Sequence, residues 1–265
     1  MKNLEFFKYE GTGNDFIVVD QRETRLLDRA DTNLIARLCH RRFGIGADGL
    51  ILLQRHHELD FEMVYFNADG REGSMCGNGG RCIVAFASRL GLVVGNCRFQ
   101  AIDGPHEARV LSDGQIALRM SSVAAPTLHD GCAVLNTGSP HFIQPVQALD
   151  EVDVHQEGQA IRYSPAFREH GINVNFVERI AEHRLRVATY ERGVESETWS
   201  CGTGVTAAAL ALAPGGHAGE LQEIIVETRG GQLKVQFRTT ASGGFDDIWL
   251  IGPASFVFRG SIAIM

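Results

Sequence analysis

The chain has 265 residues, the length of one large domain or of two ordinary ones, and 44% of them are hydrophobic. Its net charge of −7, without any run of Lys or Arg, argues against nucleic acid as the main partner. No segment approaches the ~18 uninterrupted apolar residues of a membrane-spanning helix. The early charges at Lys2, Glu5 and Lys8 argue against a signal peptide.

Short apolar runs bounded by Gly, Asp and Asn predict strands along the first half of the chain. They lie near residues 16–19, 50–53, 61–66, 97–102, 106–111 and 115–120. An N-cap at Asp28 or Asp31 predicts a helix that passes through Leu38 and stops near Gly44.

The segment 121–126 is small and contains a proline, and we place a domain boundary there. The second half repeats the plan of the first. Its strands are expected near residues 132–136, 172–178, 185–191, 223–228, 232–238, 248–251 and 255–258.

Two segments, one in each half, share the same pattern. Cys76-Gly77-Asn78-Gly79 and Cys201-Gly202-Thr203-Gly204 each place a cysteine and a Gly-x-Gly turn directly before an apolar run. Each run predicts a helix, the first reaching about Leu90 and the second ending at Pro214-Gly215-Gly216. Because both helices are apolar on nearly every side, each is expected to be buried. The simplest architecture has many short strands wrapped around one central helix, built twice.

A thiol at a helix start lies beside unpaired backbone N–H groups and the positive end of the helix dipole. Both favour the thiolate, so that the pKa of such a cysteine falls from ~8.5 toward neutrality. The same N–H groups can bind a substrate carboxylate and stabilise the charge that builds on it when the α-proton is removed. Two such thiols acting on opposite faces of one carbon would invert a stereocentre without a cofactor.

The remaining cysteines lack this context and are interpreted as structural: Cys39, Cys82, Cys97 and Cys132. All six are expected to be reduced thiols in a cytoplasmic protein. None forms a Cys-x-x-Cys pair, and no His cluster has the spacing of zinc ligands, so that no metal site is expected.

From residue 3 to about 260 the chain resembles the diaminopimelate epimerase family, which carries six motifs in this order. They are Gly11-Thr12-Gly13-Asn14-Asp15-Phe16, Gly44-Ile45-Gly46-Ala47-Asp48-Gly49, Asn67-Ala68-Asp69-Gly70 with the first cysteine motif, Gly138-Ser139-Pro140-His141, Glu191-Arg192-Gly193, and the second cysteine motif. The resemblance implies conversion of LL-diaminopimelate to the meso form without pyridoxal phosphate or metal. It also implies that Cys76 and Cys201 are the catalytic acid/base pair.

The resemblance further implies an α/β (α+β) fold of two pseudosymmetric domains, each a barrel-like set of strands around a central apolar helix. We assign residues 1–122 plus 253–265 to the half that carries Cys76, since the last strand of such enzymes returns to the first domain. Residues 123–252 form the half that carries Cys201. The resemblance also implies a small-molecule substrate, diaminopimelate, and usually a homodimer.

The match also implies roles for individual residues. Asn14, Asn67, Asn78 and Asn173 match substrate-binding positions, and Arg192 would pair with the distal carboxylate of the substrate. Gly77, Asn78, Gly202 and Thr203 would offer backbone N–H groups to the reacting carboxylate. His141 and Glu191 would assist the thiols or hold the substrate ammonium group, whereas Asp15 and Asp69 are expected to fix turns.

The chain departs from the family pattern in two places that affect the pocket. The loop from Glu191 to Thr198 is one residue longer than is common and lacks its second glycine, and Ser139 stands where Asn is common. Two alternatives stay open. A proline or hydroxyproline epimerase of the same superfamily shares the cysteine pair, but usually has His where this chain has Asn78 and lacks an Arg like Arg192. A thiol sensor would instead use Cys76 and Cys201 as a reversible disulfide.

Overall fold

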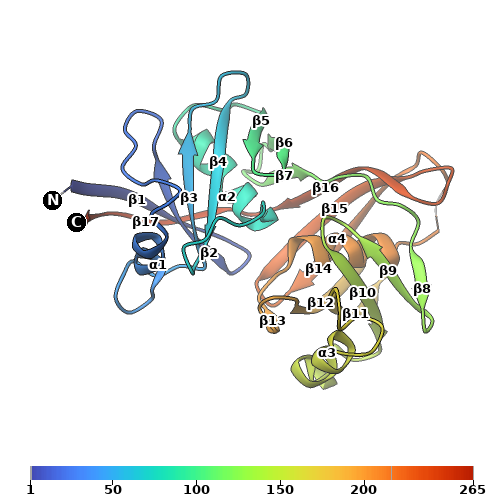
Figure 1. Cartoon of the computed structure of the whole chain (residues 1–265). Helices are drawn as coiled ribbons and strands as arrows, with labels where there is room; N and C mark the ends of the chain where they lie inside the picture. Colours follow the sequence, from blue (N-terminus) through green and yellow to red (C-terminus); the bar gives the residue numbers. More distant parts are fainter. Residues whose placement is uncertain (1, 216, 265) are drawn as a thin grey trace. The chain divides into compact units, whose positions relative to one another are not determined.

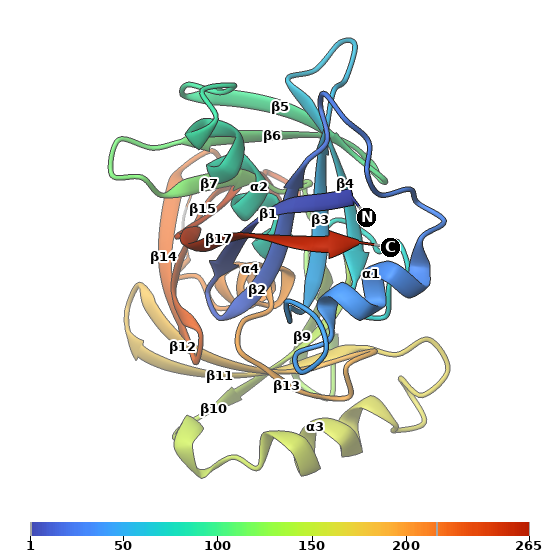
Figure 2. The same cartoon turned by 90° about the vertical axis from the view of Figure 1, so that its left-hand side faces the viewer.

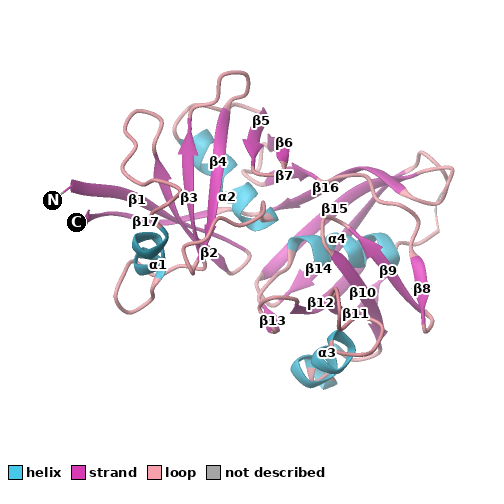
Figure 3. Cartoon of the chain, viewed as in Figure 1, coloured by secondary structure: helices cyan, strands magenta, loops and turns pink. Residues whose placement is uncertain are grey.

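The computed structural model describes residues 2–215 and 217–264. The chain forms two compact units, the first comprising residues up to Leu118 and from Gly252 onward, and the second comprising Arg119–Ile251. Strands dominate both units and helices are few (Figure 3), which confirms the predicted mixed α/β class. Two predictions fall partly outside the described residues. The predicted first half includes residues 1 and 265, and the predicted end of the second cysteine helix includes Gly216. The predicted domain division itself stays a prediction.

The first unit is built from strands at both ends of the chain. They are β1 (Lys2–Gly11), β2 (Asn14–Asp20), β3 (Gly49–Gln54), β4 (Phe61–Asn67), β5 (Asn96–Ala101), β6 (Gly104–Val110), β7 (Ile116–Arg119) and β17 (Ser255–Ile264). β17 runs antiparallel beside β1 over the length of both strands (Figure 1). From there the order is β1 antiparallel to β2, β2 parallel to β3, β3 antiparallel to β4, and β4 parallel to β5. Antiparallel pairs β5–β6 and β6–β7 complete it.

The second unit has its own set of strands. They are β8 (Thr127–His129), β9 (Cys132–Asn136), β10 (Pro140–Val146), β11 (Asn173–Ala181), β12 (Arg184–Glu191), β13 (Ser196–Thr198), β14 (Leu221–Thr228), β15 (Gly231–Thr239) and β16 (Phe245–Gly252). Pairs β8–β9 and β9–β10 are antiparallel, β10–β11 is parallel, β11–β12 is antiparallel and β12–β14 is parallel. Antiparallel pairs β14–β15 and β15–β16 follow, and the short β13 adds to β12.

The two units therefore have the same order of parallel and antiparallel strand pairs. β17 occupies the position in the first unit that β8 occupies in the second. The helices repeat as well. α1 (Thr32–Cys39) and α3 (Val154–Arg162) connect the first parallel pair of each unit, whereas α2 (Gly77–Arg89) and α4 (Gly202–Ala211) connect the second. A 3-10 turn, η1 (Leu149–Glu151), precedes α3. α3 contacts β11, β12 and β13, and Figure 2 shows it beside β11 and β13.

The predicted central helices are those that begin at the cysteines. α2 contacts β1, β2, β3, β4, β6 and β17, and α4 contacts β9, β10, β11, β12, β14 and β15. In α4, Ala207, Ala208 and Ala209 are fully buried. Thr206 is the only polar side chain among the buried residues of this helix, and its hydroxyl donates to the Gly202 carbonyl at 2.9 Å. Small side chains let the surrounding strands approach the helix closely.

Some predicted elements differ from the observed ones. α1 ends at Cys39 rather than near Gly44, because the chain leaves the helix at His40 with an extended backbone. α4 ends at Ala211, before Pro214. β1, β8, β10, β13 and α3 were not predicted. α3 is fully buried only at Gly158, and its apolar face consists of just Val154 and Ile161, which are partly buried against the core of the second unit.

Among residues 2–215 and 217–264, no helix is long and apolar enough to cross a membrane. The same residues hold no group of three or more His, Cys, Asp or Glu side chains arranged to bind a metal ion.

Candidate active site

Cys76 is the N-cap residue of α2. Its backbone is extended (φ −102°, ψ 127°), and Gly77 is the first helical residue. The first turn is closed by the Gly80 N–H, which donates to the Cys76 carbonyl at 2.7 Å. The Cys76 Sγ lies 3.6 Å from the Asn14 Oδ1. The sulfur therefore lies at the positive end of the helix dipole, where a thiolate is stabilised.

Cys201 begins α4 in the same manner. Its backbone is extended (φ −104°, ψ 109°), its exposed fraction is 7%, and the Val205 N–H donates to its carbonyl at 2.8 Å. The Cys201 Sγ lies 3.4 Å from the Thr203 Oγ1. The Thr203 carbonyl in turn accepts a hydrogen bond of 2.8 Å from the Thr137 hydroxyl. The predicted position of both cysteines at helix starts is thus confirmed, whereas their catalytic role stays a prediction.

The second glycine of the Cys201 motif is required by packing. A Cβ on Gly204 would lie 2.4 Å from the Asn175 Oδ1, a separation that real Cβ atoms do not show. Asn175 is fully buried and accepts a hydrogen bond from the Thr189 hydroxyl at 2.9 Å. Its Nδ2 lies 3.1 Å from the His141 Nδ1 and donates to the Phe142 carbonyl at 3.1 Å. Asn175 therefore links the start of α4 to the predicted site histidine.

His141 is a neutral imidazole inside the second unit. Its exposed fraction is zero, and burial lowers the pKa of His141 to about 3, with the Arg192 cation adding to the shift. The Asn175 amide presents its oxygen to Thr189, so that its NH₂ faces the His141 Nδ1 at 3.1 Å. On the other side of the ring, the Asn173 Nδ2 lies 3.5 Å from the His141 Nε2. Any role of His141 at neutral pH is consequently that of an uncharged group.

Asn173 and Arg192 are held together beside Ser139. The Asn173 Oδ1 accepts from the Arg192 backbone N–H at 2.8 Å, and its Nδ2 donates to the Ser139 hydroxyl at 2.9 Å. The Arg192 guanidinium, which is exposed, donates to the His170 carbonyl at 2.9 Å. Gly171 (φ 72°) makes room for it, since a Cβ there would lie 2.5 Å from the Arg192 Cδ. Ser139, the departure from the family pattern, thus keeps a polar contact with Asn173.

Glu191 ends β12 directly before Arg192. Its pKa is raised by burial, and the Thr198 hydroxyl partly opposes this shift. A buried carboxyl group with a raised pKa is a candidate for proton transfer. Its predicted assisting role is consistent with this chemistry.

In the first unit, Asn14 and Asn78 lie beside Cys76. The Asn78 Nδ2 lies 3.4 Å from the Asn14 Oδ1, and Asn78 is 2% exposed. Asn67 is exposed and is the last residue of β4, where its carbonyl accepts from the Gly70 N–H of the following turn at 2.9 Å. Asp69 fixes that turn, as predicted, by accepting from the Arg71 N–H at 2.9 Å.

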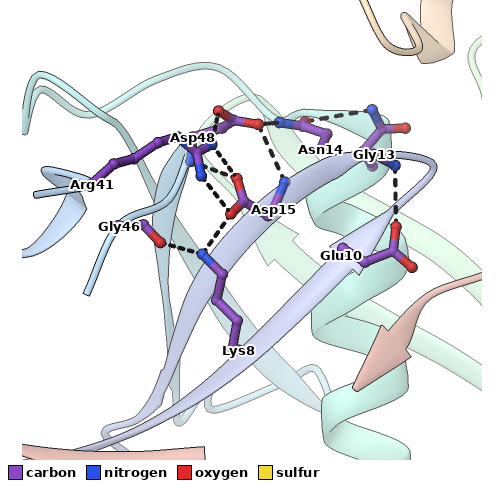
Figure 4. Close-up of polar contacts among 9 residues, drawn as sticks. Lys8, Glu10, Gly13, Asn14, Asp15, Arg41, Gly46 and Asp48 are labelled. Atoms are coloured by element: carbon purple, nitrogen blue, oxygen red, sulfur yellow. Dashed lines mark hydrogen bonds and ion pairs between the residues drawn. The ribbon is translucent and has the colours of Figure 1, made fainter. Parts of the chain in front are cut away.

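Asp15 does more than fix a turn. Its carboxylate pairs with Lys8 at 2.6 Å and with Arg41 at 2.7 Å (Figure 4). Burial alone would raise the pKa of Asp15, but the hydrogen bonds from Arg41 and Lys8 outweigh it and hold this pKa well below its usual range. The expectation of a turn residue overlooked these cations because Lys8 lies on β1, a strand that was not predicted.

Sequence reasoning also missed three polar residues that orient the site: Asp48, Arg81 and Asn175. Arg81 is fully buried, which is rare for arginine, and lies one turn into α2. Asp48 belongs to a motif already noted for its glycines, and Asn175 lies two residues beyond Asn173. The alternation of Asn173 and Asn175 on a predicted strand was the available signal, because residues two apart share one face.

The four other cysteines are unsuited to nucleophilic chemistry. Burial raises the pKa of Cys39 to about 12 and that of Cys97 to about 12. It also raises the pKa of Cys82, which is fully buried, and that of Cys132. Their thiols stay protonated at neutral pH, in agreement with a structural role.

Comparison with known sequences decides the family. The profile of the family described as diaminopimelate epimerase matches residues 6–125 and 133–257. A diaminopimelate epimerase of Flavobacterium psychrophilum is 47% identical, covering 98% of this chain and all of the relative. One from Chlorobaculum tepidum is 42% identical, covering 96% of this chain and 99% of the relative. The chain belongs to the diaminopimelate epimerase family. It is therefore an isomerase, as predicted, and the family is favoured over the proline-type alternative.

Solved structures show that the diaminopimelate epimerase family shares its fold with other proteins. A phenazine biosynthesis protein of the PhzF family from Bacillus anthracis matches with a TM-score of 0.74 at 17% identity, covering all of both chains. A probable proline racemase from Agrobacterium radiobacter K84 matches with a TM-score of 0.71 at 14% identity, covering 99% of this chain and 93% of that one. These likenesses confirm the predicted fold.

Proposed function

We propose that this chain interconverts LL-diaminopimelate and meso-diaminopimelate, with Cys76 and Cys201 as the two bases and without a cofactor. The observation that carries the proposal is the pair of Cys-Gly-x-Gly helix starts, each with its cysteine as N-cap residue. It occurs in a chain that is 47% identical to a curated diaminopimelate epimerase. A single helix-start thiol would serve many reactions, whereas a pair of them is suited to moving a proton between the two faces of one carbon.

In the proposed mechanism one sulfur begins as thiolate and the other as thiol. The thiolate removes the α-proton of the substrate and becomes a thiol, while the electron pair of the broken C–H bond is delocalised into the α-carboxylate. Backbone N–H groups of Gly77 and Asn78, and of Gly202 and Thr203, stabilise the added negative charge. The second thiol then gives its proton to the opposite face of the carbon and is left as thiolate. The reverse reaction exchanges the two roles.

The distal amino-acid group of the substrate is the part that distinguishes diaminopimelate from proline. We assign its carboxylate to Arg192, whose guanidinium suits bidentate recognition, and its remaining polar groups to Asn14, Asn67 and Asn173. The Asn173 amide supports this assignment because it holds the Arg192 backbone at 2.8 Å. Glu191 would hold an ammonium group or assist a thiol, and neutral His141 would orient the asparagines beside it.

We also propose that the protein works in the cytoplasm as a homodimer. The buried thiols Cys39, Cys82 and Cys97 support a reducing compartment. Sedimentation equilibrium tests the dimer, for which we expect a mass of about twice the 29.0 kDa of one chain. A mass of one chain across the working concentration range would contradict it.

Activity on LL-diaminopimelate under reducing conditions tests the proposed function. We expect the meso form to appear without added cofactor, and no racemisation of proline or hydroxyproline. Conversion of proline or hydroxyproline alone would move the chain to the proline type, and conversion of none would favour the thiol sensor.

Substitution of the two thiols tests their role. Cys76→Ala and Cys201→Ala should each lower kcat by at least about a thousandfold, because each removes one of the two proton carriers. Cys132→Ala is the matched control, since its half-buried thiol lies outside the site, and it should keep normal turnover. Normal turnover in either catalytic variant would overturn the two-base mechanism.

A further inference from the structure

Two side-chain amides beside Cys76 form a hydrogen-bonded row between a cation and an anion. The Arg81 Nη2 donates to the Asn78 Oδ1 at 3.0 Å, and the Asn78 Nδ2 donates to the Asn14 Oδ1 at 3.4 Å. The Asn14 Nδ2 donates to the Asp48 Oδ2 at 2.8 Å. Each amide therefore donates in the same direction, from Arg81 toward Asp48.

The Arg81 end of the row is fixed by burial. Arg81 has no exposed surface, and its guanidinium also donates to the Thr12 hydroxyl at 3.2 Å and to the Pro253 carbonyl at 3.3 Å. Thr12 has a positive φ of 51°, an uncommon conformation for a β-branched residue, so the turn before Asn14 is itself held in a strained form. Guanidinium has no acceptor, and only the oxygen of Asn78 can therefore face it.

The Asp48 end of the row is fixed by charge. The Asp48 Oδ1 accepts from Arg41 at 2.7 Å, and Arg41 also binds Asp15, which pairs with Lys8. Figure 4 shows Arg41 between the two carboxylates and the Asn14 amide turned toward Asp48. An ionised carboxylate accepts and never donates, so that only the NH₂ of Asn14 can face it.

With both ends fixed, neither amide can turn over, and the carbonyl oxygen of Asn14 is the atom that faces the Cys76 sulfur at 3.6 Å. We propose that Asp48 and Arg81 are positioning residues of the Cys76 site, which act through Asn14 to present an acceptor rather than a donor to the sulfur. An acceptor takes a hydrogen bond from the S–H form, whereas an N–H would favour the thiolate. Asp48 thereby opposes ionisation of the Cys76 thiol, which the position at the helix start favours.

Other charged and titratable groups surround this thiol. They are Arg81 and Cys82 of α2, Glu10 of β1, Asp15 of β2, Asp48 before β3, and Arg41 beyond Asn14. A test must therefore separate an effect carried by the Asn14 amide from one carried through space by a changed charge. The role of Asp48 and Arg81 in turnover rests on the proposed function. The effect of the Asn14 contact on the Cys76 sulfur can be measured without substrate.

The experiment measures the alkylation rate of Cys76 by iodoacetamide against pH in the full-length protein, with peptide mass spectrometry to isolate that residue. Asp48→Asn is close in shape but offers both a donor and an acceptor, so that only the longer 3.4 Å bond from Asn78 still orients the Asn14 amide. We expect its alkylation midpoint to fall by about half a pH unit or more, which is at least a threefold rise in thiolate below the midpoint.

A double-mutant cycle identifies the route of the effect. In an Asn14→Ala background, Asp48→Asn should leave the midpoint unchanged, because no amide remains to turn over. An equal shift in both backgrounds would overturn the proposal in favour of a simple charge effect, and an unchanged midpoint in the single variant would overturn it outright. A ¹³Cβ NMR titration of Cys76 gives the same midpoint independently of alkylation kinetics. Epimerase activity of the unsubstituted protein is assayed separately, so that failure of the proposed function is distinguished from failure of this inference.

Discussion

At the scale of single residues, burial sets the protonation state of the groups around the site. His141 has a pKa near 3 in the folded chain and 6.5 as its ordinary value, since burial excludes the charged form. Below pH 6.5 the unfolded chain therefore binds a proton that the folded chain does not. The contribution of neutral His141 to stability is fully present above about pH 6.5 and is lost as the pH falls toward 3.

This linkage predicts that His141 causes part of the loss of stability in acid. The free energy of unfolding should fall below pH 6.5 with a slope from His141 that approaches about 1.4 kcal/mol per pH unit. His141→Gln should have a smaller slope over the same range, whatever its stability at pH 7. Urea unfolding of both proteins between pH 4.5 and 7.5 measures the two slopes, and equal slopes would show that His141 is not the group responsible.

The sequence alone identified the chemical groups of the site more fully than their orientation. Cys76 and Cys201 could be found because a cysteine before Gly-x-Gly and an apolar helix is a local pattern. Asp48 and Arg81 could not, since their importance depends on contacts with Asn14 and Asn78 that chain folding creates. His141 was predicted as a site residue, but its neutral state follows from burial that no local pattern shows.

At the scale of elements, the loop before Cys201 shows how the chain accommodates its missing glycine. Glu195 stands at the position of that glycine and has a φ of 57°, in the left-handed region. Its carboxylate accepts from the Gly193 N–H at 2.9 Å and from the Tyr190 hydroxyl at 3.2 Å. These bonds offset the backbone cost of about 1 kcal/mol that a side chain incurs there.

Substitution at Glu195 separates the two effects. Glu195→Ala loses the hydrogen bonds and keeps the strained φ, whereas Glu195→Gly loses the bonds and relieves the strain. We expect the Ala variant to be less stable than the Gly variant by about 1 kcal/mol. Glu197 on β13 is the matched control, where the order should reverse because Gly weakens a strand. The same order at both positions in chemical denaturation would refute the strain argument.

Elements with apolar runs were predicted well and elements without them were missed. β3, all buried, and β9, found at its predicted bounds, came from such runs. β1 was missed because its charged residues broke the pattern, yet the structure buries Lys8 through its ion pair with Asp15. β1 forms a strand by pairing with β17 and β2, which local propensity does not show.

At the scale of the whole molecule, each unit has a core of its own, and the first depends on the last strand of the chain. β17 pairs with β1 from Lys2↔Ile264 to Glu10↔Ser255, and Leu4, Phe6 and Ile264 belong to one buried cluster. A chain that ends at Gly252 would leave β1 with an open edge and expose these side chains to water.

We therefore expect such a truncated chain to lose the structure of its first unit selectively. Hydrogen exchange measured by mass spectrometry should show loss of protection in β1 and β2, while α4, β14 and β15 keep theirs. The second core does not include β17, which is the reason for the difference. Native protection in β1 would show that β17 is dispensable, and equal loss in both units would show that the units do not fold separately.

The central claim is that two different thiols handle the proton on opposite faces of one carbon. Its most direct test is the conversion of LL-diaminopimelate in D₂O, with deuterium measured in substrate and product at low conversion. The two-base mechanism predicts one deuterium at one α-carbon of the meso product, delivered by a thiol equilibrated with solvent, and almost none in the recovered LL form. Product that retains the substrate hydrogen, or deuterium appearing equally in recovered substrate, would indicate a single base and contradict the assignment of Cys76 and Cys201 as partners.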